Sequence, residues 1–399
     1  MSYAREWLEL AVRWIHVIAG VAWIGTSFYF NWLNDRLAEP ATPEEGIRGE
    51  LWSVHGGAFY RVLKYQVAPD RLPPELHWFK WEAYLTWISG FALLVLVYYL
   101  GADVYLLDPA HAWLSPIAAV SVGIGTLLVG WWVYDGLCRS PLGRRQTALA
   151  LVGLALLGAL AFGLTRVFGS RGAYIHVGAM LGTIMAANVF RVIIPSQRDL
   201  VSAVEDGREP DAAVGAHAAM RSRHNNYLTL PVLFVMISNH YPITYGHRFN
   251  WLILVALFVI GSGTRHYFNL RNKGRPRGWI LPAAALALLA LAYAAAGTRS
   301  AGGVAVDVAG AAPIPFPEAQ AVIVRRCLTC HSVAPAHKLF DAPPKGVAFD
   351  EPEQIRSRAA KILEMAVEST VMPLGNFTHM TPEERVLLGR WIRQGANIE

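Results

Sequence analysis

The Cys-x-x-Cys-His pattern, which attaches a c-type haem, occurs near the end of the chain at Cys327-Leu328-Thr329-Cys330-His331. Two thiols at this spacing can each add to one vinyl group of a haem, and the histidine that follows can place its imidazole under the iron. A second axial ligand must come from further along the chain, and the first candidate is Met372. A thioether opposite an imidazole is the usual ligation of an electron carrier and raises its reduction potential. The pattern predicts one covalent haem c with iron ligands His331 and Met372.

Other interpretations of this region stay open. A Cys-x-x-Cys pair alone is also typical of a redox site or of half a zinc site, but near the pair only His337 could add a zinc ligand. Met380 is the second candidate for the sixth ligand, and Met365, inside a predicted helix over 354–368, is the third. A closing helix should begin with Thr381 as its N-cap, with a proline at the first helical position, and run to about residue 394.

The composition indicates a membrane protein. The chain has 399 residues, of which 54% are hydrophobic and 16% charged, and its mean hydropathy is +0.32, which is too apolar for a soluble protein of this size. The net charge of +6 is spread over loops beside apolar segments, where it orients a chain in a lipid bilayer, so we expect no nucleic-acid binding. With Cys327 and Cys330 assigned to haem, Cys138 is left alone and no disulfide framework is expected.

Eight apolar stretches approach the roughly twenty residues that a helix needs to cross a bilayer. The sixth is short and contains Pro231, so we expect it to begin near Met220 and to be kinked. The first is interrupted by Arg13 and His16 and is too long for a signal peptide, so it should remain as a span. The stretches are 8–33, 79–100, 113–137, 147–168, 172–194, 226–241, 249–270 and 279–296.

Charge then predicts the orientation and the domains. The connections after the first, third, fifth and seventh spans hold most of the basic residues and should be cytoplasmic. Both termini then lie outside, in the periplasm of a bacterium, which is the compartment of c-type haem attachment. We expect an all-α fold: an eight-helix transmembrane bundle over 1–297, a linker rich in Gly, Ala, Val and Pro over 298–317, and a class I-like cytochrome c domain over 318–399.

Three histidines form a layer near the outer face of the membrane: His16, His176 and His240. One interpretation is a b-type haem held between two of them, with His16 and His176 preferred, because neutral imidazole is the usual haem ligand in a membrane bundle. The other is histidines that hydrogen-bond across helices or lie at the headgroup level. A single c-type haem accepts one electron at a time, which favours a second centre.

A second polar layer lies near the inner face. Its Arg191 supplies a rigid cationic fork, and its asparagines and His224 supply donors and acceptors, a set that suits a flat, anionic heterocycle with amide-like edges. In the alternative, Arg191 and Arg265 are positive-inside anchors paired with Asp35 or Asp135. The members of the layer are Asn31, Asn34, Asp35, Asp135, Asn188, Arg191, His224, Asn225, Asn226, Arg265 and His266.

Several motifs resemble the membrane domain and fused cytochrome domain of bacterial cytochrome c urate oxidases. The resemblance covers nearly the whole chain, and its order, membrane domain before cytochrome, makes it specific. The motifs are Trp14-Ile15-His16-Val17, Ala22-Trp23-Ile24-Gly25, Asn188-Val189-Phe190-Arg191-Val192-Ile193-Ile194-Pro195, Arg223-His224-Asn225-Asn226-Tyr227-Leu228-Thr229-Leu230-Pro231, Ser238-Asn239-His240-Tyr241, Cys327-Leu328-Thr329-Cys330-His331, Pro344-Lys345-Gly346-Val347, Met372-Pro373-Leu374-Gly375-Asn376 and Thr381-Pro382-Glu383-Glu384-Arg385.

The resemblance implies oxidation of urate to 5-hydroxyisourate in purine degradation, with electrons passed to the c-type haem and on to a soluble cytochrome or a terminal oxidase. We assign the residue roles ourselves. Arg191 would offset the charge of urate beside Asn188 and Asn225, and a histidine or an aspartate would take a proton, with His224 preferred over Asp135 because imidazole titrates near neutral pH.

Two other functions stay open. A quinol-to-cytochrome reductase would also use histidine-ligated haem and a membrane cavity. A non-catalytic electron-transfer or haem-handling membrane protein is the other, because 14–25 also looks like the first span of membrane proteins in copper uptake and haem synthesis. Urate would not reduce such a carrier, and dependence on a quinol would identify the reductase.

Overall fold

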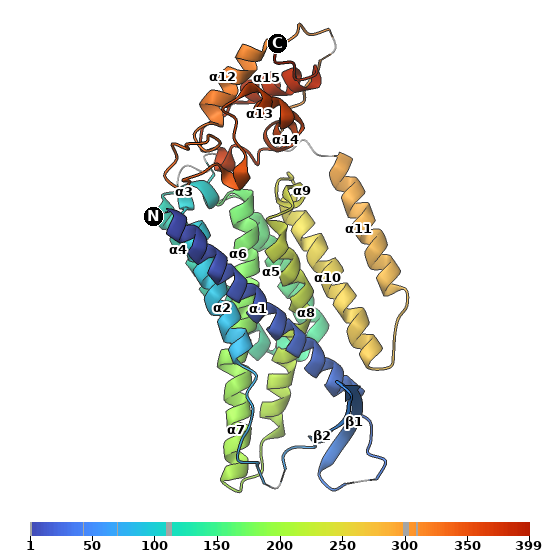
Figure 1. The fold of residues 1–399 in the computed structure, drawn as a ribbon. Helices are drawn as coiled ribbons and strands as arrows, with labels where there is room; N and C mark the ends of the chain where they lie inside the picture. The colour runs from blue at the N-terminus through green and yellow to red at the C-terminus, as the bar shows by residue number, and fades with distance from the viewer. Residues whose placement is uncertain (1, 43, 70, 109–113, 298–302, 309) are drawn as a thin grey trace.

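The computed structural model describes residues 2–42, 44–69, 71–108, 114–297, 303–308 and 310–399. Long helices lie side by side in an elongated bundle, and a smaller group of helices from the C-terminal quarter of the chain lies at one end (Figure 1). The N-terminal end of the first helix is at this same end of the bundle (Figure 1). The fold is mostly helical, as the sequence predicts.

Each predicted span corresponds to a helix, with shifted ends. The fifth runs on as one continuous helix to Glu205, and the second ends in a π-helical stretch, η1. The predicted start of the third span, Trp113, lies outside the described residues. The helices are α1 (Ser2–Arg36), α2 (Trp81–Leu93) with η1 (Leu94–Tyr99), α4 (Pro116–Arg139), α5 (Gln146–Leu164), α6 (Ser170–Asn188) with η4 (Val189–Ile193) and α7 (Ile194–Glu205), α8 (Ala212–Ser238), α10 (Asn250–Asn272) and α11 (Ile280–Gly297), with the short α3 (Ala102–Tyr105) and α9 (Pro242–Tyr245) between them.

Six of the described helices are long and apolar enough to cross a membrane: α1, α2 with η1, α4, α5, α6 with η4 and α7, and α10. This is compatible with a membrane protein. Helix α8 is not among the six, since its first half carries Arg221 and Arg223, and α11 is a shorter apolar helix, Ile280–Ala296. The count of eight spans therefore stays a prediction. Pro231 lies inside α8, which begins at Ala212, earlier than expected.

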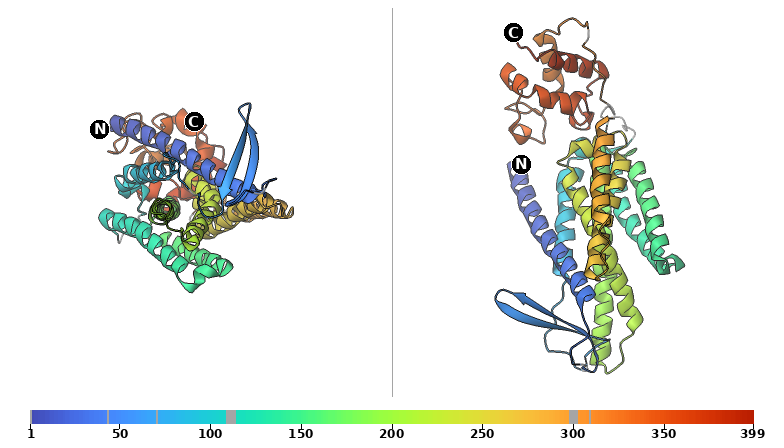
Figure 2. Two further views of the ribbon diagram at one scale, coloured as in Figure 1. Left: turned by 90° about the horizontal axis from the view of Figure 1, so that it is seen from below. Right: turned by 90° about the vertical axis from the view of Figure 1, so that its right-hand side faces the viewer.

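Helix α6 is the centre of the bundle, because it packs against α2, α4, α5 and α8 (Figure 2). The most apolar window of the continuous helix through α6 is 61% buried, whereas that of α1 is 6% buried. Glycines allow the close approach of its neighbours. A Cβ atom added at Gly178 would lie 2.6 Å from Val235 Cγ1 on α8, and one at Gly123 on α4 would lie 2.6 Å from His176 Nε2.

Gly123→Ala is expected to destabilise the bundle by about 1–3 kcal/mol, because the new methyl group meets a buried ring that has no room to move. Gly125→Ala on the same helix is the matched control, since a Cβ atom there would have no neighbour within 4 Å. Unfolding of the two variants in detergent, followed by circular dichroism, measures the difference. Equal stability of both variants would contradict the close contact between α4 and α6.

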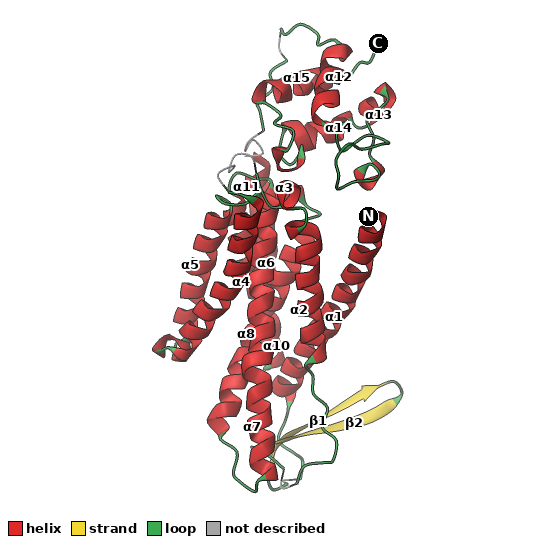
Figure 3. Ribbon diagram, turned by 90° about the vertical axis from the view of Figure 1, so that its left-hand side faces the viewer, coloured by secondary structure: helices red, strands yellow, loops and turns green. Residues whose placement is uncertain are grey.

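The segment between α1 and α2 forms a β-hairpin, so the expectation of an all-α fold is incomplete. Strand β1 (Ile47–His55) pairs with β2 (Ala58–Tyr65) in antiparallel register, at the end of the bundle opposite the C-terminal quarter of the chain (Figure 3). Gly56 and Gly57 form the two-residue turn with φ of 57° and 81°. Two strand-like runs separated by two glycines are a strong hairpin signal, although no strand was predicted here.

The C-terminal quarter has its own hydrophobic core, formed by Ile323, Ile355, Val367, Leu388 and Trp391 with smaller neighbours. Its elements are α12 (Phe316–Arg326), η5 (Pro344–Gly346), α13 (Pro352–Ser357), α14 (Ala359–Ile362), η6 (Leu363–Val367), η7 (Leu374–Asn376) and α15 (Pro382–Arg393). We call residues 303–308 and 310–399 the second domain.

Three details of the second domain can be compared with the predictions. The closing helix is confirmed: the Thr381 hydroxyl accepts from Glu384 N at 3.3 Å at the start of α15. The predicted helix over 354–368 is divided at Arg358, whose φ and ψ are −108° and 6°. In the expected linker, residues 298–302 and 309 lie outside the described residues, but Val306 is buried in the second core. Val306 of the expected linker thus packs with the second core, and the predicted boundary at 318 stays a prediction.

Candidate functional site

The inner polar layer contains a buried ion pair. Arg221 of α8, which is 0% exposed, donates to Asp135 Oδ1 of α4 at 2.6 Å, and the partly exposed Arg139 donates to Asp135 Oδ2 at 2.6 Å. Arg221 also reaches Asn188 Oδ1 of α6 at 3.3 Å. Asn188 Nδ2 in turn donates to Asn225 Oδ1 at 2.8 Å. The layer is therefore connected across three helices.

His224 extends this network toward α5. Gln146 Oε1, which can only accept, lies 2.9 Å from His224 Nε2, so Nε2 carries the proton and Nδ1 accepts from the Tyr134 hydroxyl at 2.8 Å. The same hydroxyl accepts from Asn188 at 3.1 Å. We call the set of Tyr134, Asp135, Gln146, Asn188, Arg221, His224 and Asn225 the Asp135 network. Most donors and acceptors of this network pair with one another. The assignment of His224 as the general base stays a prediction.

A second inner cluster lies on the other side of α8. Arg265 of α10 is 5% exposed, and its Nε donates to Asn226 Oδ1 at 2.8 Å. Its guanidinium carbon lies 3.8 Å from the centre of the Phe28 ring of α1. Among the described residues, two buried polar atoms beside it have no hydrogen-bond partner: Asn226 Nδ2 and Asn269 Oδ1. We call Phe28, Asn226, Arg265 and Asn269 the Arg265 cluster.

The structure does not bring Arg191 into either cluster. Its side chain is exposed and lies over the ring of Phe190, 5.7 Å from the ring centre. Arg221 lies beside the Asp135 carboxylate instead. It was not among the site residues predicted from the sequence. A signal for it existed, because Arg221 lies one helical turn before Asn225 and shares its face of α8. Tyr134 and Gln146 were missed as well, and nothing in their local sequence distinguishes them.

The three outer histidines are not brought together. His16 donates through Nδ1 to the Thr86 carbonyl of α2 at 2.9 Å, and His240 is exposed. His176 is 0% exposed: its Nδ1 donates to Gly172 O at 2.8 Å, and its Nε2 lies 3.2 Å from the Tyr99 hydroxyl. Because both nitrogens of His176 have partners and its ring lies against Gly123, this arrangement does not fit a haem held between His16 and His176. A b-type haem remains a prediction, which a haem count tests.

The Cys-x-x-Cys-His motif forms a single turn at the end of α12. The backbone N–H groups of Cys330 and His331 both donate to Cys327 O, at 3.1 and 2.8 Å. His331 donates through Nδ1 to the Val347 carbonyl at 2.8 Å, which leaves Nε2 free in the tautomer that binds a metal. Burial raises the pKa of both thiols, that of Cys327 to about 12, so neither has the lowered pKa of a redox-active pair. These residues fit the attachment of a c-type haem.

Met372 is held by the residues around it. Its N–H donates to Met365 O at 2.8 Å, and its carbonyl accepts from Arg385 Nη1 at 2.8 Å. Arg385 is 3% exposed and also donates to Ala366 O and Asn376 Oδ1. Met372 packs against the second core together with Cys327 and Val347, whereas Met380 is buried within that core. The choice of Met372 over Met380 as an iron ligand stays a prediction.

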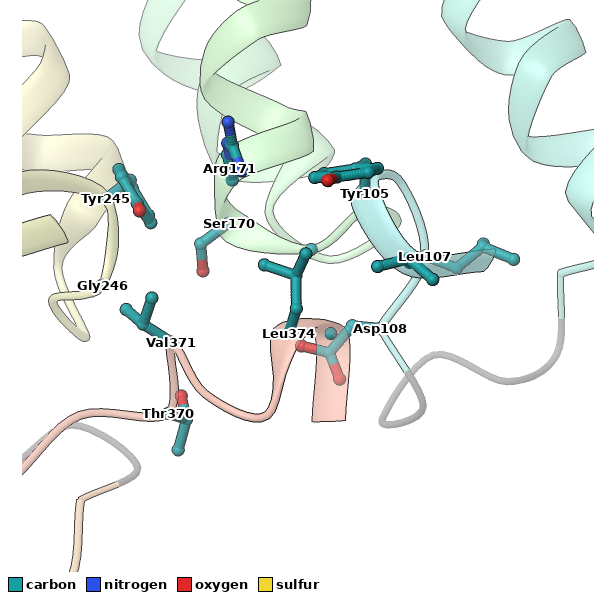
Figure 4. A pocket seen from close by; sticks show the side chains of 13 residues that line it. Tyr105, Leu107, Asp108, Ser170, Arg171, Tyr245, Gly246, Thr370, Val371 and Leu374 are labelled. Carbon is teal, nitrogen blue, oxygen red and sulfur yellow. The ribbon is translucent and has the colours of Figure 1, made fainter. Parts of the chain in front are cut away.

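The loop that carries Met372 also contacts the end of the helical bundle nearest the second domain. Gly375 has a φ of 57°, and a Cβ atom there would lie 2.9 Å from Leu107 O. Val371 and Leu374 face Arg171 and Tyr245 across a cavity of about 50 Å³ (Figure 4). The loop that carries the predicted axial ligand therefore lies on the face of the second domain that meets the bundle.

In the described residues, the structure defines a mostly helical protein with six helices long enough to cross a membrane and two buried polar clusters at one level of the bundle. The family model "Urate oxidase N-terminal" matches residues 2–296, so the chain belongs to this family. Comparison with curated proteins and with solved structures finds no match. Membership supports a function related to urate oxidation and suggests an oxidoreductase that acts on urate.

Proposed function

We propose that the protein is a membrane-bound urate oxidase that converts urate to 5-hydroxyisourate and passes the electrons to a c-type haem on its second domain. The observation that carries the proposal is the family match over residues 2–296 in a chain that continues into Cys327-Leu328-Thr329-Cys330-His331. The reaction combines urate with one water molecule and releases two electrons and two protons. Those electrons need an acceptor. The Cys-x-x-Cys-His motif, which lies beyond the residues that the family model matches, would hold the haem that accepts them.

Four residues would hold the haem: Cys327 and Cys330 by thioether bonds, and His331 and Met372 as axial ligands. When bound, a c-type haem supplies a one-electron acceptor outside the membrane. The chain orients its ligands through the Val347 carbonyl on His331 and through Arg385 on the Met372 loop. We place the second domain in the periplasm of a bacterium, at the inner membrane, with a soluble cytochrome c or a terminal oxidase as the next acceptor.

We place the oxidation in the inner polar layer, where a buried cation can offset the charge of the urate anion. The Asp135 network would hold α4, α6 and α8 together in the same polar layer as the substrate. Within this network we prefer His224 over Asp135 as the residue that would receive a proton released in the oxidation, because the Tyr134 hydroxyl already donates to its Nδ1.

The test is an anaerobic visible spectrum of the detergent-purified protein before and after urate is added, with a pyridine haemochrome count of the haem types per chain. We expect urate to reduce the c-type haem and 5-hydroxyisourate to form. If urate leaves the haem oxidised while a quinol reduces it, the protein is a quinol-to-cytochrome reductase. If neither reduces it, the protein is an electron carrier without this activity. The count also tests the b-type haem.

A further inference from the structure

The inner layer contains a buried arginine that has no carboxylate of the described residues within salt-bridge distance. Arg265 is 5% exposed and forms no salt bridge with any described residue. Arg221, at the same level on α8, is 0% exposed and has Asp135 at 2.6 Å. Burial of a charge is strongly unfavourable unless an opposite charge offsets it. Arg221 has such a partner in Asp135, whereas Arg265 has no salt bridge to a described residue. The carboxylate of Asp35 acts on Arg265 only from beyond salt-bridge distance, so no described carboxylate pairs with Arg265 directly and an anionic ligand would complete it.

Two further groups beside Arg265 are incomplete. Asn226 is 0% exposed, and its Oδ1 accepts from Arg265 while its Nδ2 has no partner in the described part of the chain. Asn269 is 8% exposed and lies four residues after Arg265, so it shares that face of α10, and its Oδ1 is likewise unpaired. An unpaired buried donor or acceptor is unfavourable, so each of these groups favours a ligand that pairs with it. The site thus presents one unpaired donor and one unpaired acceptor next to a cation that forms no salt bridge.

The ring of Phe28 fixes the direction in which Arg265 can bind. The ring covers one face of the guanidinium at 3.8 Å, and Nε is used by Asn226. The edge that carries Nη1 and Nη2 forms no hydrogen bond to a described residue. A guanidinium stacked in this way presents a planar fork, which matches a flat anionic partner through two parallel hydrogen bonds. The cluster comes from helices α1, α8 and α10, which pack against one another (Figure 1).

We propose that Arg265, Asn226 and Asn269 form the subsite that binds the anionic edge of urate. This proposal rests on the proposed function and locates its substrate on the α10 side of α8. The urate anion is flat and carries both N–H and C=O groups on its rim, so it can meet the Arg265 fork with a deprotonated N–C=O edge, accept from Asn226 and donate to Asn269. The phosphate of a lipid headgroup only accepts, and would leave Asn269 Oδ1 unpaired.

The experiment measures urate binding by calorimetry and by the urate-induced rise in melting temperature. It uses full-length protein reduced beforehand with dithionite, because the reduced protein cannot take electrons from urate. We expect Arg265→Gln to weaken binding roughly tenfold to hundredfold, the loss of a charge-assisted contact. The control is Arg271→Gln, at the exposed end of the same helix, which should bind urate as the wild type does.

Stability without urate gives a second readout. Arg265→Gln removes a buried charge that forms no salt bridge and keeps a donor for Asn226, so its melting temperature without urate should be no lower than that of the wild type. Asn269→Leu removes the unpaired acceptor and should weaken urate binding severalfold, which keeps the proposal testable if Arg265→Gln does not fold.

The outcomes separate this inference from the proposed function. If urate neither binds to nor reduces the wild type, the proposed function fails. If the wild type binds and oxidises urate while Arg265→Gln binds it equally tightly, the inference is overturned and the function stands. Loss of co-purified anionic lipid from Arg265→Gln with unchanged urate affinity would assign the cluster to a headgroup instead. Weaker binding in Arg191→Gln alone would return the substrate to the residue first predicted from the sequence.

Discussion

Arg221→Met is expected to lower the free energy of unfolding of the helical bundle by about 3–5 kcal/mol. The substitution leaves Asp135, which is 7% exposed, with only Arg139 as a partner, and it removes the donor to Asn188. A buried carboxylate that loses its buried cation keeps most of its desolvation cost while losing most of the compensating attraction. Thermal unfolding in detergent, with the yield of folded protein, measures the effect.

Two comparisons make this prediction specific. Arg139→Ala removes the other partner of the same carboxylate, but the Arg139 side chain is 64% exposed, so its loss should cost no more than about 1 kcal/mol. The double variant Asp135→Leu with Arg221→Met replaces the pair by apolar side chains and should recover much of the lost stability. Equal effects of Arg221→Met and Arg139→Ala would show that the buried pair does not hold α4 to α8.

The sequence predicts features whose causes are local. The haem-attachment motif, the Thr381 N-cap and the existence of each apolar helix depend on residues a few positions apart, and the structure has the cap and the helices where they were expected. The hairpin at Gly56 and Gly57 also has a local signal. It was not predicted, because the basic residues of this connection were used to infer the orientation and the alternation of its apolar residues was not used.

The choice between Arg191 and Arg221 could not be made from the sequence. Counting from Asn188 with a period of 3.6 places Arg191 on the same helical face. The helix widens at η4 (Val189–Ile193), and a π-helical turn shifts the register of the residues within it. Arg191 is exposed as a result, and the buried guanidinium comes from another helix, so the partner of Asp135 depends on how α4 and α8 pack. Likewise, the pairing of Asn225 with α6 and of Asn226 with α10 depends on how α8 packs against those two helices.

The double variant Cys327→Ala with Cys330→Ala is expected to lose covalent haem completely. Without either thiol no thioether bond can form, and a haem held only through His331 and Met372 is released when the protein is denatured. Haem staining after denaturing electrophoresis measures this loss, and the anaerobic spectrum with urate measures the accompanying loss of electron transfer to the haem. The helical bundle has its own core around α6, so its stability should change little.

Cys138→Ala is the matched control for that variant. Cys138 is buried beside His224, with its Sγ 3.9 Å from Nδ1, so its substitution removes a thiol of the chain without touching the motif. It should retain covalent haem and its reduction by urate. If the double variant keeps a haem that survives denaturation, the thiols do not attach it. If the double variant loses the haem while urate still binds to the bundle, binding of the substrate and acceptance of its electrons belong to separate parts of the chain.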